Sequence, residues 1–576
     1  MPEKVRIAWN VYHKYDELTR ILHELAGAYS GLASLYSIGR TYQGRDIWCL
    51  EITNKSTGPA LHKPGFQIDG NTHSGEVTGC AVALYDAYYL LSRYGEDDFV
   101  TGLVDTRVIY VIPRVSADGA EHYLTTPHSS RSSLRPYPLT EEEWLETDGL
   151  YPHDINGDGW ALQMRLEDPQ GEWKASAKDP RLMVKRQPKD GQGPFYHIYP
   201  EGLIRNYRGG GIKMAPPLYN LDFNRNWPSN WAVTQDGAGP YPLCEPENRA
   251  LADFWRDHPN LTGVMTYHTF SGVIIRTFVT KPDDAFNAHD LKVYKEIGRI
   301  GTEVTGYESV SVFEGLTDDK KNPRHGNSKD WWYEDLGAYV FCIELWSLAN
   351  HAGIEVKDYM GFLIGRSEED DLKLLAYNDS ELGGQGFMPW TPFDHPQLGR
   401  VEIGGWKTKY TFQNPPHHLL KEEIDRTFMF CLKHAALSPL VRVTGAAATA
   451  VGGGVHKVTA TVRNEGWLPT NLTKHAQRIG VARPDTVRID IPEGAEILSG
   501  RQITEIGNLE GKWNVQGGMF GARPADSSRT LEWLIKAPAA SGAAAAPGEV
   551  KVQVRSHKGG RHTATVKLDG RQGEAR

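Results

Sequence analysis

A short polar segment between a buried strand and a long helix constrains this chain more than any other feature. Residues 65–69 form an apolar stretch typical of a buried strand, and residues 77–85 are small and apolar over a length sufficient for a helix. His73 and Glu76 lie between them. Open α/β sheets bind ligands at the carboxyl ends of their strands, and an imidazole with a carboxylate suits a borderline cation such as zinc. A His and a Glu three residues apart occur often by chance. A metal site therefore also needs a third ligand from elsewhere in the chain.

Strands and helices alternate along the first part of the sequence. Apolar residues recur at helical spacing over 15–29, and β-branched residues are dense over 106–112. Further helices are expected at 76–93, 246–257, 291–305 and 418–437, and further strands at 262–267 and 339–345. This alternation predicts an α/β fold with a mixed central sheet and helices on both faces.

Two later regions have a different character. From about 120 to 220 the sequence is rich in proline and loses its periodicity, so we expect an irregular insertion that serves the function. Residues 441–454 are small, which predicts a linker. Beyond them, apolar and polar residues alternate in short stretches, which predicts a β-sandwich. The expected organisation is a first domain over 1–440, a linker over 441–454 and a sandwich over 455–576.

Bulk composition excludes several classes of protein. A net charge of −9 over 576 residues argues against a nucleic-acid binder. The five cysteines are scattered and form no CxxC pattern, which favours a reducing compartment. The N-terminus shows no signal peptide, and no uncharged apolar run approaches about 20 residues. We therefore expect a cytoplasmic protein that does not bind membranes, although a secreted protein without its leader would look the same. The oligomeric state is not indicated.

Four further residues have side chains suited to binding or catalysis. His268 follows the predicted strand 262–267, where it could bind a metal or simply be a hydrogen-bonded buried histidine. Glu344 lies within an apolar run, where a carboxylate is costly unless it has a role or a salt-bridge partner. Asn224 and Arg225 place an amide beside a guanidinium that can grip a carboxylate, although a surface turn would look similar.

Together these segments resemble the zinc metallocarboxypeptidases of the carboxypeptidase A/B type (funnelins), in a bacterial-type form with a C-terminal β domain. The resemblance covers roughly residues 10–435. The matching motifs occur in the family's order: Gly39 with Gly44-Arg45-Asp46-Ile47, His73-Ser74-Gly75-Glu76, Asp118-Gly119, Asn224-Arg225-Asn226-Trp227, Glu245-Pro246-Glu247, His268, Asp330-Trp331 and Glu344. Each motif alone is modest, but eight in order are specific. The resemblance implies the zinc carboxypeptidase fold.

The resemblance also implies roles for individual residues. It implies one zinc ion with three protein ligands, His73, Glu76 and His268, and a fourth position for water. Glu344 would be the general base that takes a proton from water and delivers it to the leaving amine. Asn224 and Arg225 would hold the terminal carboxylate of a peptide substrate, which limits cleavage to the last peptide bond.

The sequence departs from the family at several positions. In the digestive enzymes an Arg precedes the zinc-binding Glu, whereas this chain has Gly75. The arginine that polarises the scissile carbonyl is assigned to Arg165, with Arg131 and Arg135 as alternatives. The family's mobile Tyr has no counterpart between Val310 and Asp330.

Lys329 bears on substrate preference. It directly precedes Asp330-Trp331, where the family places the floor of the pocket for the C-terminal side chain. A lysine there favours Glu or Asp by charge complementarity. An equally good interpretation is a lysine that extends from a helix to solvent.

A calcium site is considered at 154–158. Asp154 and Asp158 resemble the start of an EF-hand loop, but the residue at loop position 12 is Arg165 rather than Glu. An Asx-rich turn is therefore expected in place of a calcium site.

The expected function is that of a zinc-dependent carboxypeptidase acting on peptides, with a preference for acidic C-terminal residues. A related zinc amidohydrolase, such as a deacylase or a cell-wall peptide hydrolase, stays open because of Gly75 and the missing Tyr. A non-catalytic peptide- or glycan-binding module is disfavoured, because all three ligands and the base are present.

Overall fold

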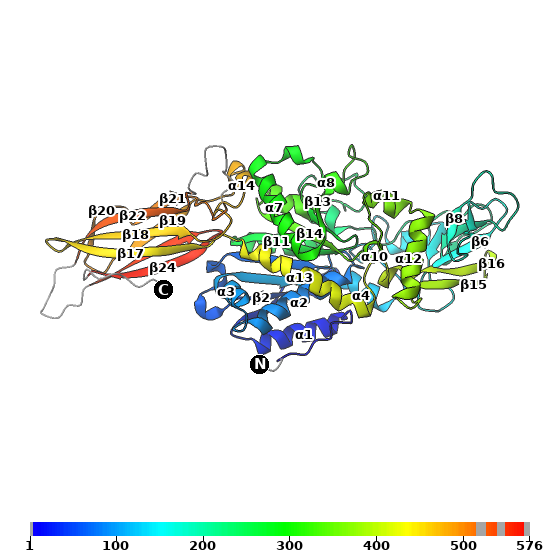
Figure 1. Ribbon diagram of the computed structural model, residues 1–576, viewed down its shortest axis with the longest axis horizontal. Coiled ribbons are helices and arrows are strands. Elements are labelled where there is room, and N and C mark those ends of the chain that lie inside the picture. Colours follow the sequence, from blue (N-terminus) through cyan, green and yellow to red (C-terminus); the bar gives the residue numbers. More distant parts are fainter. Residues whose placement is uncertain (1–3, 514–525, 538–547, 569–576) are drawn as a thin grey trace.

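An eight-stranded mixed sheet lies at the centre of an elongated molecule (Figure 1). The computed structural model describes residues 4–513, 526–537 and 548–568. In spatial order the strands of this sheet are β1 (Ala33–Arg40), β2 (Asp46–Ile52), β4 (Val108–Ile112), β3 (Gly65–Gly70), β11 (Leu261–Thr269), β14 (Tyr339–Leu345), β12 (Val273–Arg276) and β13 (Glu308–Ser311). The four neighbours β4, β3, β11 and β14 run parallel. Their carboxyl ends therefore meet at one edge of the sheet.

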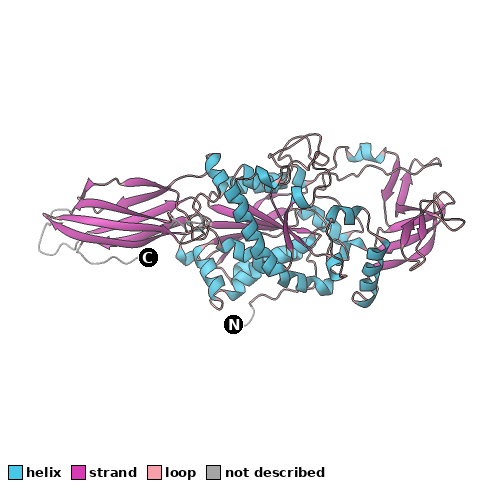
Figure 2. Cartoon of the chain, turned by 45° about the horizontal axis from the view of Figure 1, so that its top comes forward, coloured by secondary structure: helices cyan, strands magenta, loops and turns pink. Residues whose placement is uncertain are grey.

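Helices cover both faces of this sheet, as predicted (Figure 2). One face carries α1 (Tyr15–Ala28), α2 (Val77–Arg93), α3 (Asp98–Thr106), α7 (Ala288–Thr305) and α13 (Leu420–Ala436), and the other carries α6 (Pro246–Asp257) and α9 (Ser328–Glu334). Along β4, Ile109 and Val111 pack in the first core, whereas Val108, Tyr110 and Ile112 pack in the second. A strand buried on both faces reads as a continuous apolar run, which explains the dense pattern in the sequence.

The remaining α-helices before residue 440 are short, apart from α12. They are α4 (Ala117–Thr125), α5 (Glu141–Leu145), α8 (Val312–Gly315), α10 (Leu348–His351), α11 (Tyr359–Ile364) and α12 (Glu368–Ser380). None of the helices in the described ranges is both long enough and apolar enough to cross a membrane.

The region over 120–220, expected to be irregular, consists mostly of loops and turns but also contains short strands. β5 (Gly149–Pro152) pairs with β10 (Gly202–Arg205). A second sheet of six strands has the order β15 (Phe387–His395), β16 (Gly399–Trp406), β6 (Gln163–Glu167), β9 (Tyr196–Pro200), β7 (Trp173–Ala175) and β8 (Met183–Lys185). The stability of strands this short depends on pairing with other strands. One partner of β6 is β16, which lies far along the chain. The local sequence does not reveal such a pairing.

Two four-stranded sheets form the C-terminal domain, in agreement with the predicted sandwich. Their orders are β17 (Val441–Gly452), β18 (Val455–Asn464), β22 (Ser528–Lys536), β20 (Glu496–Ser499) and β21 (Ile503–Gly507), β19 (Asp485–Asp490), β23 (Glu549–Ser556), β24 (Gly560–Lys567). The predicted linker over 441–454 is wrong, since this stretch forms β17. It pairs with β18 along its length, and Val441 and Val443 enter the core of the sandwich. Pairing with a neighbour outweighs the linker-like composition.

Buried hydrogen bonds attach this domain to the first one at α14 (Lys474–Arg478). Asp290 of α7 accepts bonds from the backbone N–H groups of Lys474 and His475 at 2.8 and 2.9 Å, and from the Tyr333 hydroxyl at 3.0 Å. The carboxylate thus satisfies two amides at the start of a helix that belongs to the other domain. Leu468, from the same segment, packs in the main core of the α/β domain.

Replacement of Asp290 should weaken this junction. We expect Asp290→Ala to lower the free energy of unfolding by about 2 kcal/mol, because buried amides lose a charged acceptor. Urea unfolding of the full chain measures the effect. Asp284→Ala, at an exposed position in the short 3-10 helix η4 (Asp283–Ala285), is the matched control. Equal stabilities of the two variants would contradict the role assigned to Asp290.

Candidate metal centre

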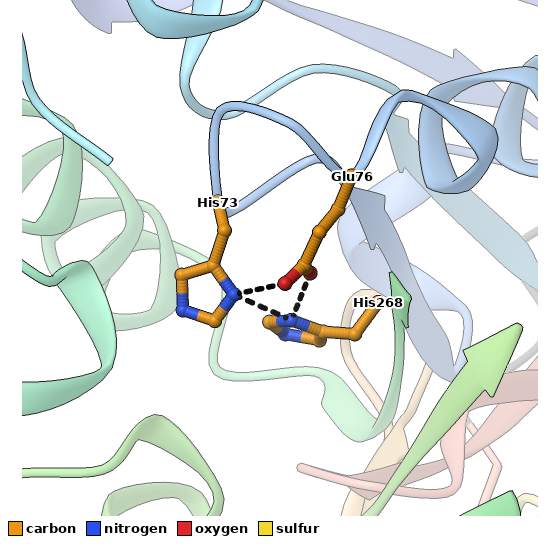
Figure 3. A group of neighbouring side chains, drawn as sticks. All are labelled: His73, Glu76 and His268. Carbon is orange, nitrogen blue, oxygen red and sulfur yellow. Dashed lines mark hydrogen bonds and ion pairs between the residues drawn. The ribbon is translucent and has the colours of Figure 1, made fainter. Parts of the chain in front are cut away.

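Three side chains from two neighbouring strand ends meet at one point (Figure 3). His73 and Glu76 follow β3, and His268 lies near the end of the adjacent strand β11. All three are buried, and their ligand atoms lie within 4.8 Å of one another. His268 Nδ1 is 3.1 Å from His73 Nδ1 and 2.7 Å from Glu76 Oε2. His73 Nδ1 is 2.8 Å from Glu76 Oε1. The fold therefore brings together the three residues predicted as metal ligands.

Asp222 determines which nitrogen of His73 faces the cluster. Burial by itself raises the pKa of Asp222, but Arg131, Arg225 and His73 outweigh burial and hold this pKa well below its usual value. Its carboxylate Oδ1 lies 3.2 Å from His73 Nε2, so it accepts the Nε2 proton. Nδ1 of His73 then presents its lone pair to the cluster.

This arrangement fits a cation. The Nδ1 lone pair of His73 faces the Glu76 carboxylate at 2.8 Å, and a cation between them would balance the negative charge. Two imidazole nitrogens and one carboxylate oxygen are a donor set that zinc prefers, with a fourth position open. The carboxylate that orients His73 is the outer partner that zinc-binding histidines usually have.

Close packing explains the small residues around the loop. A Cβ atom on Gly119 of α4 would lie 1.9 Å from Ser74 Oγ, so only glycine lets the helix approach the loop. A Cβ atom on Gly75 would lie 2.7 Å from the Gln413 side chain and 2.8 Å from the Tyr123 ring. Gln413 and Tyr123 therefore occupy the space beside Gly75 that a larger side chain would need.

Glu344 lies beside the cluster on β14. It is the register partner of His268 and the one residue of β14 that is not fully buried. Among the described residues its carboxylate has no hydrogen-bond or ion-pair partner, so the alternative of a buried salt bridge does not hold there. Burial and then the Glu76 charge raise the pKa of Glu344 to about 7, although Lys329 and His73 oppose them. The carboxylate is available to take a proton.

Comparison with known proteins agrees with this geometry. A family model described as zinc carboxypeptidase matches residues 18–366, which is more than half of the chain. The chain belongs to the zinc carboxypeptidase family. Zinc carboxypeptidases use one catalytic zinc ion, and the group of His73, Glu76 and His268 is compact enough to hold a metal ion. A second family model, for a domain of unknown function, matches residues 440–567.

Individual relatives cover different parts of the chain. Carboxypeptidase M of Mus musculus is 31% identical over 291 residues, which are 43% of this chain and 63% of the relative. Carboxypeptidase D of Drosophila melanogaster is 36% identical over 113 residues, which are 19% of this chain and 8% of the relative. The chain thus spans less than two thirds of these curated relatives. The solved carboxypeptidase A from Helicoverpa armigera is 15% identical, with a TM-score of 0.39, and the match covers 66% of this chain and 76% of that one.

The prediction that Arg165 polarises the scissile carbonyl is wrong. Arg165 lies on β6 in the six-stranded sheet, where its Nε donates to Glu402 at 2.7 Å. Its guanidinium also stacks on the rings of Tyr196 and Trp390, 4.7 and 4.8 Å from their centroids. The pairing of β6 with β16 holds it there, outside the metal centre of this zinc carboxypeptidase domain.

Arg131, named as an alternative from the sequence, lies at the metal centre. Its Nε donates to Asp222 Oδ2 at 2.8 Å, and its Nη1 lies 3.5 Å from Glu76 Oε1. Its side chain is 43% exposed, so donors remain accessible from the solvent side. Arg135, the other alternative, forms an ion pair with Glu245 instead.

The three residues predicted to bind substrate lie next to the ligands. Asn224 Nδ2 is 3.4 Å from His268 Nε2, and Arg225 Nη1 donates to the Asn224 carbonyl at 2.7 Å. Lys329 is only 4% exposed, so the alternative of a lysine that extends to solvent is wrong. Its ammonium has no hydrogen-bond or ion-pair partner within the described ranges, and its charge lowers the pKa of the Glu344 carboxyl.

Two features of the site were not predicted from the sequence. Asp222 directly precedes the motif that contains Asn224, and a carboxylate so close to a proposed substrate-binding pair was a usable signal. The second feature is a cavity of about 700 Å³ that adjoins Gly75 through Tyr123 and Gln413. Aromatic residues of the insertion line it: Trp144, Tyr151, Trp160 and Tyr219. The insertion therefore builds a wall beside the metal centre.

The turn at 154–158 uses its carboxylates for the backbone. Asp154 accepts hydrogen bonds from the N–H groups of Gly157, Asp158 and Gly159 at 2.7, 3.2 and 2.8 Å. This is the pattern of an Asx-rich turn. In the described part of the chain, His73, Glu76 and His268 are the one group of three metal-binding side chains found close together.

Loss of Asp222 should weaken metal binding. We expect Asp222→Ala to reduce zinc affinity by about 10- to 100-fold, because His73 loses the partner that fixes its proton and ring orientation. Competition with a chromogenic chelator measures this affinity. Asp236→Ala, which removes an exposed carboxylate nearby, should leave it unchanged. An Asp222 variant that binds zinc as tightly as the control would show that Asp222 does not orient His73.

Proposed function

We propose that this protein hydrolyses the C-terminal peptide bond of peptides with the help of one zinc ion. The observation that carries this proposal is the position of Glu344. It stands in register beside His268, at the edge of a three-ligand cluster, with no cation within bonding distance among the described residues. A carboxylate whose pKa is raised by burial next to a metal site is suited to move protons.

Glu344 and Arg131 have different roles in the proposed hydrolysis. Glu344 takes a proton from the attacking water as the water oxygen bonds to the carbonyl carbon, and it delivers this proton to the amine when the carbon–nitrogen bond breaks. Arg131 donates to the carbonyl oxygen as negative charge develops on it. Zinc, when bound, supplies Lewis-acid polarisation and lowers the pKa of water.

The end of the peptide is held by Asn224 and Arg225. Arg225 is largely buried, and its nearest carboxylate, Asp222, is 3.9 Å away, so the guanidinium keeps donors for a second carboxylate. The buried ammonium of Lys329 supports a preference for C-terminal Glu or Asp. A lysine without a bonded partner in the described residues is costly, and an acidic side chain of the substrate would neutralise it.

The cavity beside Gly75 supports an extended substrate. With about 700 Å³ of space and an aromatic lining, it is large enough for several atoms of the peptide upstream of the scissile bond. The site also keeps a second candidate function, a related zinc amidohydrolase. Gly75 stands where the digestive enzymes carry an arginine, and Gln413 occupies the space beside it. An amidohydrolase would use this cavity for an acyl or cell-wall group.

Glu344→Gln distinguishes an enzyme from a binding module. We expect this variant to lose nearly all turnover, because the amide cannot accept a proton, while it keeps its zinc content. Metal analysis and peptide hydrolysis are measured on the same preparations. If the protein were a non-catalytic peptide binder, the wild type would show no turnover and the variant would bind peptide as before.

A peptide panel tests the preference for acidic ends. We expect kcat/KM for peptides ending in Glu or Asp to exceed that for peptides ending in Phe or Lys. Lys329→Met should lower the value for acidic ends by about 10-fold or more, because the favourable ion pair is lost. Equal or inverted rates in the wild type would discard this role for Lys329. Equal cleavage of peptides with amidated C-termini would favour the amidohydrolase instead.

A further inference from the structure

A second cavity lies at the junction of the two domains, at the opposite edge of the central sheet from the metal centre. Its volume is about 520 Å³. Lys63 and Pro64 line it and directly precede β3, whereas His73 follows β3. The length of the strand therefore separates the two sites by about 20 Å. β17, β23 and β24 of the C-terminal domain close the other side.

Basic side chains from both domains line this junction cavity. They are His62 and Lys63 from the first domain, and Arg442, Arg561 and His562 from the second. The one carboxylate in the lining is that of Asp105, and its Oδ1 already accepts bonds from Asn54 at 2.7 Å and Tyr94 at 2.9 Å. Such clustering stands out in a chain with a net charge of −9.

Arg442 and Arg561 have unused hydrogen-bond donors. Within residues 4–513, 526–537 and 548–568, neither Arg442 nor Arg561 has a side-chain hydrogen bond or an ion pair, although Glu465 attracts Arg442 from a greater distance. The Nζ of Lys63 donates only to uncharged oxygens, those of Thr53, Asn54 and Thr57. Among the described residues, none of these three cations therefore forms an ion pair with a carboxylate.

The cations also act on one another across the junction. Burial lowers the pKa of Lys63 to about 8, and Arg442 of the other domain adds to this effect while Asp105 opposes it. Burial, and then Arg442, lower the pKa of His562 to about 4. Its Nδ1 accepts a hydrogen bond from the Val443 N–H at 3.1 Å, so the proton of the neutral ring lies on Nε2. An anion in the cavity would relieve this repulsion and meet several unused donors.

We propose that the junction cavity binds the phosphate group of a small molecule. Guanidinium groups match phosphate with paired hydrogen bonds, and Arg442 and Arg561 are free to supply them. A bare phosphate fills only part of about 520 Å³, which leaves room for the rest of a small phosphorylated ligand. Because cations of both domains face the cavity, the bound anion also stabilises their contact.

Thermal unfolding of the full chain in inorganic phosphate tests this proposal. We expect millimolar phosphate to raise the unfolding midpoint by about 3 °C relative to chloride at equal ionic strength, as expected for a ligand at many times its Kd. Titration calorimetry with inorganic phosphate should show saturable binding. No shift and no binding heat beyond those in chloride would overturn the proposal.

A double variant shows whether the arginines are responsible. Arg442→Gln with Arg561→Gln should abolish both the shift and the binding heat, and its peptide hydrolysis should be unchanged, since neither residue is near the metal centre. The matched control is Lys536→Gln with Lys551→Gln, which removes two exposed charges at the far end of the same domain and should respond to phosphate as the wild type does. A phosphate response retained in the arginine variant would place the anion elsewhere. Because stability and binding are the readouts, failure here leaves the proposed peptidase function untouched.

Discussion

The parallel ladder of β3, β11 and β14 is the constraint on which this structure depends. It brings the segment with His73 and Glu76, the end of β11 with His268, and Glu344 to one edge of the sheet. Successive side chains of a strand point to opposite faces, so a shift of one residue in the register of β14 would turn Glu344 away from His268. The burial of these strands on both faces holds that register, because a slip would misplace every apolar side chain at once.

The balance of buried charges around Asp222 is the second determinant of the site. This carboxylate contacts His73 on one side and Arg131 on the other, with Arg225 at 3.9 Å. It therefore orients the ring of His73 and holds Arg131 beside the three-residue cluster. Glu344 and Lys329, in contrast, have no bonded partners in the described part of the chain. Groups left without partners in a buried site are those that a substrate or a proton can engage.

The C-terminal domain is attached by specific contacts rather than by a flexible tether. Asp290 binds the start of α14, and the Nζ of Lys558, in the turn between β23 and β24, donates to the Leu261 carbonyl at the start of β11 at 2.6 Å. The second of these contacts joins the sandwich directly to β11, the strand that carries His268. The junction cavity lies beside this contact, where cations of the two domains face each other. An anion bound there would act on the same attachment.

The sequence alone determined the α/β domain and singled out the three side chains that meet in the metal-binding cluster. Dense apolar runs such as 106–112, and helical periodicity such as 15–29, identify elements whose burial is large on one or both faces. Eight motifs in the family's order, from Gly39 to Glu344, carried the resemblance to the zinc carboxypeptidases. Tertiary structure alone decided the position of Arg165, the pairing of the short strands in the insertion and the formation of a strand in place of a linker at 441–454. Each of these depends on a partner distant in the chain. Local composition does not indicate which strands will pair or which ion pairs will form.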